Sequence, residues 1–582
     1  MQPIGGGGYS DAPPRGGRYD RRDPMPLTAP SPEREALDRA LRSVLDELRR
    51  APDAALPAVF ERALRLAGEN PRIARAGRVL HTCSQAALRA LLRRGTSAPV
   101  AAHLDALEAL TGRHPARYAY AAGLAVAAQG SAALDPRARE HLAERAAALR
   151  ERLPDDATVL VHWSSVIEAL SAGDPEAMVP ICAALAEARA RRPWDVTLLK
   201  RWAAALAARV DRLRVKKQWA PIPALRDELA AAMDGEPHGR RVALEVAKAT
   251  RDVMYVWEDA EDVAAVEREL ARLQALREQA DDRRDPARSL FAEQWVWGAK
   301  VLVTTCDAAS WRWGASSVEW LPAADDLLRR AAETLEAMWT EVMRKASPRK
   351  VDLLAAAMQD HAWCVRQARD RAGEARWHER LTQLARRFPG SSAVREWAHS
   401  AGSRALSLAE DGEVAEVLTL TAAIEAAAAQ RKGDASIREA HAKGIAASAA
   451  ALRKSGAPEE AAARVEALAA MATTYQGEPM LVRLFALAAK ELAAHCVGSG
   501  RLSEAEGVLR RMEEVVSLPQ GEGLGRRVYA QALEATVTAA LGSAPELAAA
   551  ARRRLRALAA SHPREKAIGE ALRRVKAPAR RA

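Results

Sequence analysis

Residues 150–170 read RERLPDDATVLVHWSSVIEAL and residues 189–209 read RARRPWDVTLLKRWAAALAAR, and the two stretches carry one pattern. Pro154 and Pro193 are 39 residues apart, and a tryptophan, Trp163 or Trp202, follows each proline by nine residues. Proline cannot continue a helix, and the apolar residues after each proline recur at helical spacing. Each copy therefore predicts the end of one helix, a turn and the start of the next helix.

The same interval can be followed along most of the chain. Between neighbouring junctions it is 39–49 residues, apart from one interval of 62 residues and one of 84 that holds two units. A fixed period of this kind is typical of stacked helical hairpins, and about ten to twelve antiparallel hairpins fit. No segment alternates apolar and polar residues well enough to predict a strand, so we expect an all-α fold, an α-solenoid. The junctions are Pro71, Pro115, Pro154, Pro193, Pro237, Pro286, Pro348, Pro389, Gly433, Pro479 and Pro563.

The spacing inside a unit is also regular. Large apolar residues fall 6, 9 and 13 positions after Pro154, at Leu160, Trp163 and Ile167, and a small residue, Ser164, falls at position 10. This pattern resembles the tetratricopeptide repeat family, whose first helix carries a large–large–small–large motif and whose second helix ends before a proline. The units are longer here than the family's repeat of about 34 residues. The resemblance implies a right-handed superhelix with a concave peptide-binding face.

An arginine recurs two residues before several junctions. A cation in the last turn of a helix complements the helix dipole and caps free carbonyl groups. The alternative is a ladder of cations for an anionic partner. The arginines are Arg113, Arg152, Arg191 and Arg387.

The net charge of +11 is concentrated at one end of the chain. Residues 551–582 hold 11 Lys and Arg against 2 Glu, a net charge of +9, and residues 1–30 hold 4 Arg against 3 Asp. The 520 residues between them therefore carry a net charge of only +1 (11 − 9 − 1). The overall charge is no reason to assign nucleic-acid binding to the whole protein.

The five cysteines are scattered and form no CxxC pair, so neither a zinc knuckle nor a disulfide framework is indicated. The first residues, MQPIGGGGYSD, lack the basic start and apolar core of a secretory signal. The longest apolar stretch, residues 118–128, is too short for a transmembrane segment. We expect a cytoplasmic protein.

Composition divides the chain into five segments. Residues 1–30, rich in Gly, Pro and Arg, are predicted to be a disordered leader, and their fragment PRGGRYDRRD resembles the Arg-Gly-Gly segments of RNA-binding proteins. Residues 31–285 are predicted to form an N-terminal repeat array, beginning with a helix that Ser31 caps. Residues 286–347 form an atypical Trp-rich repeat, residues 348–550 a C-terminal array, and residues 551–582 a basic capping helix and tail.

The Trp-rich repeat is the place where the period fails. It holds six of the 14 tryptophans, and its insertion TTCDAASWRWGASSVEWLP has the Gly, Ser and Thr content of a loop. Trp and Arg are enriched at binding hot spots; the alternative is that these tryptophans fill a wide core. Trp295, at position 9, is expected in the core, whereas Trp297 is expected on the concave face. The candidate partner-binding residues are Glu293, Trp297, Lys300, Trp311, Arg312 and Trp313.

Catalytic motifs are missing from the sequence. There is no P-loop, no HExxH and no GxSxG, so we expect no enzyme activity and no cofactor. The segment Gly521–Gly525 is either a flexible turn or an anion cradle before a helix. His361 and Cys364 lie one helical turn apart, but no third ligand is evident, so no metal site is predicted.

Two functions from different classes remain. The first is a non-enzymatic scaffold that binds a segment of a partner protein in the solenoid groove. The second is a nucleic-acid-associated protein that uses its leader and basic C-terminus, where a solvated capping helix is the structural alternative. The basic candidates are Arg552, Arg553, Arg554, Arg556, Arg573, Arg574 and Lys576.

Overall fold

The structure is a computed structural model that describes residues 31–95, 97–111, 116–236, 238–279, 288–314, 318–518 and 523–576. The chain divides into two compact units, Met1–Ala205 and Leu206–Ala582, and the division falls within helix α9 (Val196–Val215). The predicted leader and the junction residues Pro115, Pro237 and Pro286 lie outside the described residues.

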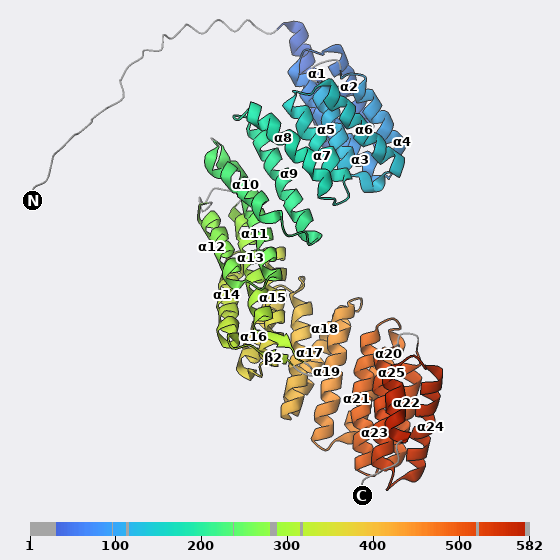
Figure 1. The fold of residues 1–582 in the computed structure, drawn as a ribbon. Coiled ribbons are helices and arrows are strands. Elements are labelled where there is room, and N and C mark those ends of the chain that lie inside the picture. Colours follow the sequence, from blue (N-terminus) through green and yellow to red (C-terminus); the bar gives the residue numbers. More distant parts are fainter. Residues whose placement is uncertain are drawn as a thin grey trace, which may run out of the picture. The chain divides into compact units, whose positions relative to one another are not determined.

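Unit 1 is a series of helical hairpins (Figure 1). The helix starts follow the capping signals of the sequence: Ser31 accepts a hydrogen bond from the Arg34 N–H at the start of α1, and Asp156 caps α7 just after Pro154. Its elements before α9 are α1 (Pro32–Arg50), α2 (Leu56–Glu69), α3 (Ala74–Arg93), α4 (Ser97–Glu108), α5 (Ala116–Gln129), η1 (Ser131–Ala133), α6 (Pro136–Arg152), α7 (Ala157–Leu170), η2 (Glu176–Met178) and α8 (Val179–Arg191).

Unit 2 continues the series of hairpins, with one short sheet among them. After α9 its elements are α10 (Ile222–Gly235), η3 (Gly239–Val242), α11 (Ala243–Asp259), α12 (Val263–Gln279), α13 (Arg288–Ala309), β1 (Trp311–Trp313), β2 (Val318–Trp320), α14 (Ala324–Arg344), α15 (Pro348–Gln367), α16 (Arg371–Arg387), α17 (Ala393–Asp411), α18 (Val414–Gln430), α19 (Ala435–Lys454), α20 (Pro458–Thr474), α21 (Pro479–Gly498), α22 (Leu502–Val516), α23 (Leu524–Ala540), α24 (Pro545–Ser561) and α25 (Lys566–Lys576).

The helices of unit 2 form two layers. Each odd-numbered helix from α11 to α23 packs against the next odd-numbered helix, as α19, α21 and α23 do in Figure 1, and also against its even-numbered neighbours. Small residues allow the close approach: a Cβ added at Gly402 of α17 would lie 2.9 Å from the Ala440 carbonyl oxygen of α19. The odd-numbered helices therefore form a continuous layer with one face free of the even-numbered helices.

Polar contacts repeat with the same period as the core. Near the start of an odd-numbered helix, an arginine pairs with the acidic residue that precedes the next odd-numbered helix. Arg117 lies 3.0 Å from Asp156, and Arg395 lies 3.1 Å from Asp434, each pair being 39 residues apart. These pairs join successive hairpins, although each contributes little to stability where it is exposed.

The prediction of a helical-hairpin fold is confirmed, with one correction. The insertion after residue 303 was predicted to be a loop, and no strand was expected. Instead α13 continues to Ala309, and β1 and β2 form an antiparallel pair in which Trp311 faces Trp320. The Trp-Arg-Trp alternation is the period of a strand, and aromatic residues favour strands.

Within the described residues, no helix combines the length and the apolar character needed to cross a bilayer.

Candidate functional site

The first group of candidate residues lies on α13, and its tryptophans are held by neighbouring helices. Trp295 is only 9% exposed, which confirms its predicted place in the core. Trp297 is half-buried; its Nε1–H donates to the Tyr255 Oη of α11 at 2.7 Å. The guanidinium groups of Arg251 and Arg349 lie 3.9 and 4.1 Å from its ring centroid. Trp297 thus links α11, α13 and α15. A partner could contact only the part of its indole ring that these neighbours leave exposed.

Glu293 and Lys300 flank Trp297 by one turn on each side, and they differ in their surroundings. Glu293 lies 3.5 Å from Arg349, one of the arginines on Trp297, so it belongs to the same contact between α13 and α15. Lys300 is half-buried and faces acidic side chains of other helices. The prediction that these residues bind a partner therefore rests on Lys300 more than on Glu293.

The second group of candidate residues forms the β-hairpin. Trp311 packs on Trp363 of α15, with ring centroids 5.4 Å apart. Arg312 donates to Glu319 across the strands at 2.9 Å, and the Leu321 N–H closes the base of the hairpin on the Ser310 carbonyl at 3.0 Å. Trp313 is 71% exposed, edge-on to Trp311. Trp311 thus fixes the hairpin to α15, whereas Trp313 faces solvent.

The candidate residues make two sites rather than one. Trp297 lies 12 residues before the end of α13 at Ala309, which is about 18 Å of helix. The hairpin begins only beyond that end. A contact at Trp313 is therefore separate from one at Trp297.

A buried polar pair lies close to the hairpin. His361 Nδ1 is 2.8 Å from Asp307 Oδ1, and both side chains are buried. Burial raises the pKa of Asp307, against the effect of its hydrogen bond to His361, and burial also raises the pKa of the Cys364 thiol. The His361 ring is thus paired with the Asp307 side chain, and Cys364 is a protonated thiol in the core. Across the described ranges, no three His, Cys, Asp or Glu side chains are grouped to hold a metal ion.

A group of charged residues on odd-numbered helices was not predicted from the sequence. The charge of Lys300 on α13 acts on three carboxyl groups, those of Glu258 on α11, Asp360 on α15 and Glu396 on α17. Burial raises the pKa of Glu258 to about 7, and burial also raises the pKa of Glu396. Desolvation raises the pKa of Asp360 as well, although its side chain is exposed. We call these four residues the charged cluster: Glu258, Lys300, Asp360 and Glu396.

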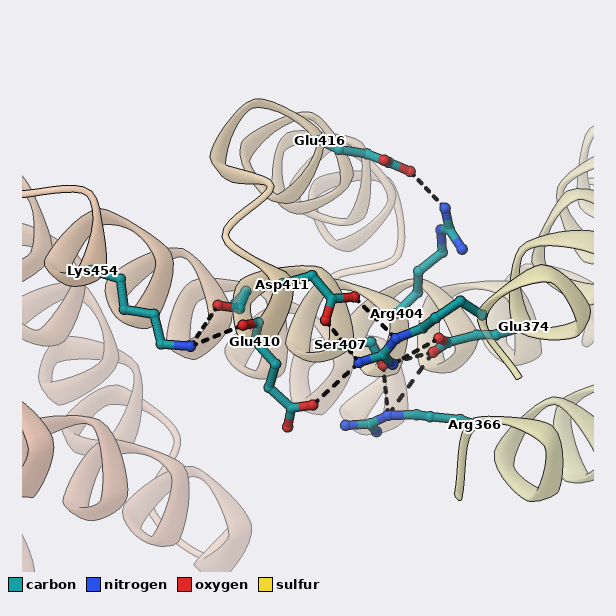
Figure 2. A network of polar contacts seen from close by, with 10 residues as sticks. Arg366, Glu374, Arg404, Ser407, Glu410, Asp411, Glu416 and Lys454 are labelled. Atoms are coloured by element: carbon teal, nitrogen blue, oxygen red, sulfur yellow. Dashed lines mark hydrogen bonds and ion pairs between the residues drawn. The ribbon is translucent and has the colours of Figure 1, made fainter. Parts of the chain in front are cut away.

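A dense polar network joins the ends of α15, α17 and α19 with the starts of α16 and α18 (Figure 2). Arg366 donates to the Ser407 hydroxyl at 2.9 Å, and that hydroxyl donates to Glu374 at 2.9 Å. Lys454 donates to the backbone carbonyls of Ala409 and Glu410. These groups satisfy one another between successive hairpins, so the network serves packing.

The arginines before the junctions lie in the last turns of their helices and reach the preceding hairpin. Arg152 lies 3.3 Å from Glu108, and Arg191 lies 3.4 Å from Asp155. Arg113 lies outside the described residues. Arg387 of α16 donates to the Met343 sulfur of α14 at 3.3 Å. The contacts of Arg152, Arg191 and Arg387 named here are therefore all with residues of the chain itself.

The basic C-terminal residues are divided between ion pairs and solvent. Arg554 lies between Glu506 and Glu513, at 3.6 and 3.4 Å, and Arg574 donates to Glu534 at 2.9 Å. Only the backbone of Lys576 is described, and Gly521 and Glu522 of the glycine-rich segment lie outside the described residues. The remaining candidates are the half-buried Arg552 and the exposed Arg553, Arg556 and Arg573.

No protein-family model matches the sequence, and no curated protein is similar to it. Solved structures with a similar arrangement include yeast importin-β (Kap95p), with 13% identity, 93% of this chain and 66% of that chain covered, and a TM-score of 0.39. Ypp1 has 11% identity, coverage of 94% and 87%, and a TM-score of 0.30. Naa15/Naa10 bound to HypK-THB has 11% identity, coverage of 93% and 96%, and a TM-score of 0.23. By the packing of its own helices, the chain is an all-α repeat protein built of tetratricopeptide-like helical hairpins.

Proposed function

We propose that this protein is a non-enzymatic scaffold that binds a partner protein, and that Trp313 is an anchor of the contact. The observation that carries the proposal is the exposure of this tryptophan on a hairpin that its other contacts hold in place. A large exposed aromatic side chain costs free energy in water, and tryptophan is enriched among residues that dominate protein interfaces. Because the strand that carries Trp313 is already paired with β2, little conformational entropy is lost when a partner covers Trp313.

The proposal extends to the cellular setting. All five cysteines are free and buried, which suits a reducing compartment such as the cytoplasm. The absence of the common catalytic motifs supports a protein without enzyme activity.

The test is affinity purification of the tagged full-length protein beside two tryptophan variants. Trp313→Ala should lose the partner, with Kd weakened by about 30-fold once the partner is purified, as for a hot spot of about 2 kcal/mol. Trp194→Ala is the matched control, because Trp194 lies in unit 1, in the turn before α9, and is 70% exposed. Circular dichroism should show equal helix content in all three proteins. Equal affinity of the Trp313→Ala variant, or an equal loss in the control, would contradict the proposal.

The alternative, nucleic-acid association, is supported by the exposed arginines Arg553, Arg556 and Arg573. It predicts retention on RNA or DNA that weakens steeply with salt and that is lost in an Arg553→Glu/Arg556→Glu variant. Retention that survives these substitutions would rule out this surface.

A further inference from the structure

The β-hairpin of unit 2 has an outer edge with unpaired backbone groups, because β1 pairs with β2 on one side only. The Leu321 N–H donates to the Ser310 carbonyl at 3.0 Å, so Arg312, two positions farther along, belongs to the next hydrogen-bonded pair of the ladder. In an antiparallel pair, such residues alternate with residues whose N–H and C=O groups point away from the partner strand. Trp311 and Trp313 are these alternate residues, so their backbone groups point outward from β1.

The outward backbone groups of β1 determine what kind of structure can cover them. Among the described residues, no hydrogen bond from outside the hairpin reaches the backbone N–H or C=O of Trp311 or Trp313. Trp313 is 71% exposed, and the Arg312 side chain is 70% exposed. Outward groups recur at every second residue, about 6.8 Å apart, and another extended backbone presents donors and acceptors at the same spacing. The edge therefore specifies a β-strand as its occupant.

The side chains of β1 specify the residues of that strand. Successive side chains of a strand point to opposite faces, so Trp311 and Trp313 lie on one face and Arg312 on the other. On the first face, apolar residues of an added strand would lie beside the two indole rings, whose centroids are 5.3 Å apart. On the second face, the Arg312 Nε–H donates to Glu319 at 2.9 Å, and the guanidinium has further N–H groups for a second carboxylate. The complementary sequence is apolar–acidic–apolar.

We propose that an extended segment of a partner protein adds to the edge of β1 as a third strand, with an acidic residue beside Arg312 and apolar residues beside Trp311 and Trp313. The residue opposite Trp313 exchanges backbone hydrogen bonds with it, and the residue beside Arg312 directs its own backbone groups away from β1. The inference rests on the proposed scaffold function, because it names the form in which the partner covers Trp313.

The test begins with selection of random dodecapeptides, displayed on phage, against the immobilised full-length protein, and keeps the peptides that a Trp313→Ala variant does not retain. The expected consensus is apolar–acidic–apolar. One selected peptide is then synthesised with a single N-methylated backbone amide at each position in turn. Kd should weaken at least about tenfold at the two positions that pair with Trp311 and Trp313, and it should change little at the position between them.

A matched pair of protein variants tests which edge of the hairpin is used. The α-hydroxy analogue of tryptophan replaces Trp313 in one protein and Trp320 in the other, which turns one backbone amide into an ester and keeps the indole ring. Each ester weakens one acceptor of the same ladder pair, the carbonyl of Arg312 or that of Glu319. Only the ester at position 313 removes an outward N–H from β1. It should weaken peptide binding about threefold to tenfold, whereas the ester at position 320 should leave Kd unchanged.

Three results would overturn the inference: N-methyl losses without a period of two residues, no peptide that depends on Trp313, or equal Kd values for the two ester proteins. Sedimentation of the full-length protein tests a second copy of the chain as the occupant. Equal masses of the unaltered protein and the Trp313→Ala variant are expected. A dimer that only the unaltered protein forms would assign the edge to self-association instead.

The two proposals fail separately. If a partner is captured through Trp313 but the peptide series lacks the period of two residues, only the added strand is refuted. If the peptide series shows that period but the Trp313→Ala variant still captures the partner, only the anchor assignment is refuted.

Discussion

Buried His103 of α4 should make unit 1 less stable as the pH falls. The imidazole is 6% exposed, stacks on Phe60 with ring centroids 3.6 Å apart, and lies 3.0 Å from the Ser84 hydroxyl. Burial lowers the pKa of His103 to about 4, because no carboxylate offsets the loss of solvent around the charged ring. In the unfolded chain the pKa of histidine is about 6.5.

The sign and size of the effect follow from these two pKa values. Between about pH 6.5 and about pH 4 the unfolded chain binds a proton at His103 that the folded chain does not, so stability falls as the pH falls. Above about pH 6.5 both states are neutral and the contribution is fully present. From about pH 7 to about pH 5 the free energy of unfolding should decrease by about 2 kcal/mol through His103 alone.

The assay compares the protein with a His103→Gln variant, which keeps a hydrogen-bonding group near Ser84 but does not titrate. Urea unfolding of the full-length proteins, followed by tryptophan fluorescence at both pH values, gives four free energies. The difference between the two pH dependences isolates His103, because every other titrating group is present in both proteins. Equal pH dependence in the two proteins would refute the reasoning.

Two further predictions concern unit 2. Glu341→Gln should lower the free energy of unfolding, measured by urea denaturation, by about 3 kcal/mol. The Lys350 ammonium is 1% exposed and lies 3.1 Å from Glu341, so the substitution leaves it without this charged partner in the interior. An unchanged urea midpoint would contradict this. Gly239→Ala should lower the melting temperature, because the added Cβ would overlap the carbonyl oxygen of Met233 at the junction before α11. Gly433→Ala is the control and should melt normally, because its added Cβ meets no atom. Equal melting temperatures of the two variants would contradict the prediction.

The helical hairpins could be predicted because their signals are local. Pro154 and the residues around it stop one helix and start another, and the apolar spacing after it decides which face is buried. The same spacing placed Trp163 and Trp202 in the core, where both are buried. The effects of prolines and of apolar periodicity extend over about ten residues, so they can be recognised in the sequence without knowing how the helices pack.

A further signal was present in the sequence but was overlooked. Four residues before the junction prolines stand Arg150 and Arg189. Their guanidinium groups lie 3.9 and 3.7 Å from the ring centroids of Trp163 and Trp202, so each repeat pairs a cation with its core tryptophan. The prediction considered only the arginines at the second position before the junctions.

The rest depends on tertiary arrangement. The strands β1 and β2 have three residues each, which is too few for an alternating pattern to predict a strand. The alternation Trp-Arg-Trp was the sequence feature that pointed to β1. The residues of the charged cluster stand 21, 14, 12 and 7 positions after their junctions, so no common register joins them in the sequence. Only the packing of successive odd-numbered helices brings these residues together: Glu258, Lys300, Asp360 and Glu396.

The most direct test of the scaffold proposal is photo-crosslinking from single positions of the full-length protein. A photoreactive phenylalanine analogue replaces Trp313 in one protein and Trp194 in another, and both are irradiated in the cells that express them. We predict a covalent adduct larger than the chain from position 313 and none from position 194. An adduct from position 194 alone, or none from position 313, would contradict the account.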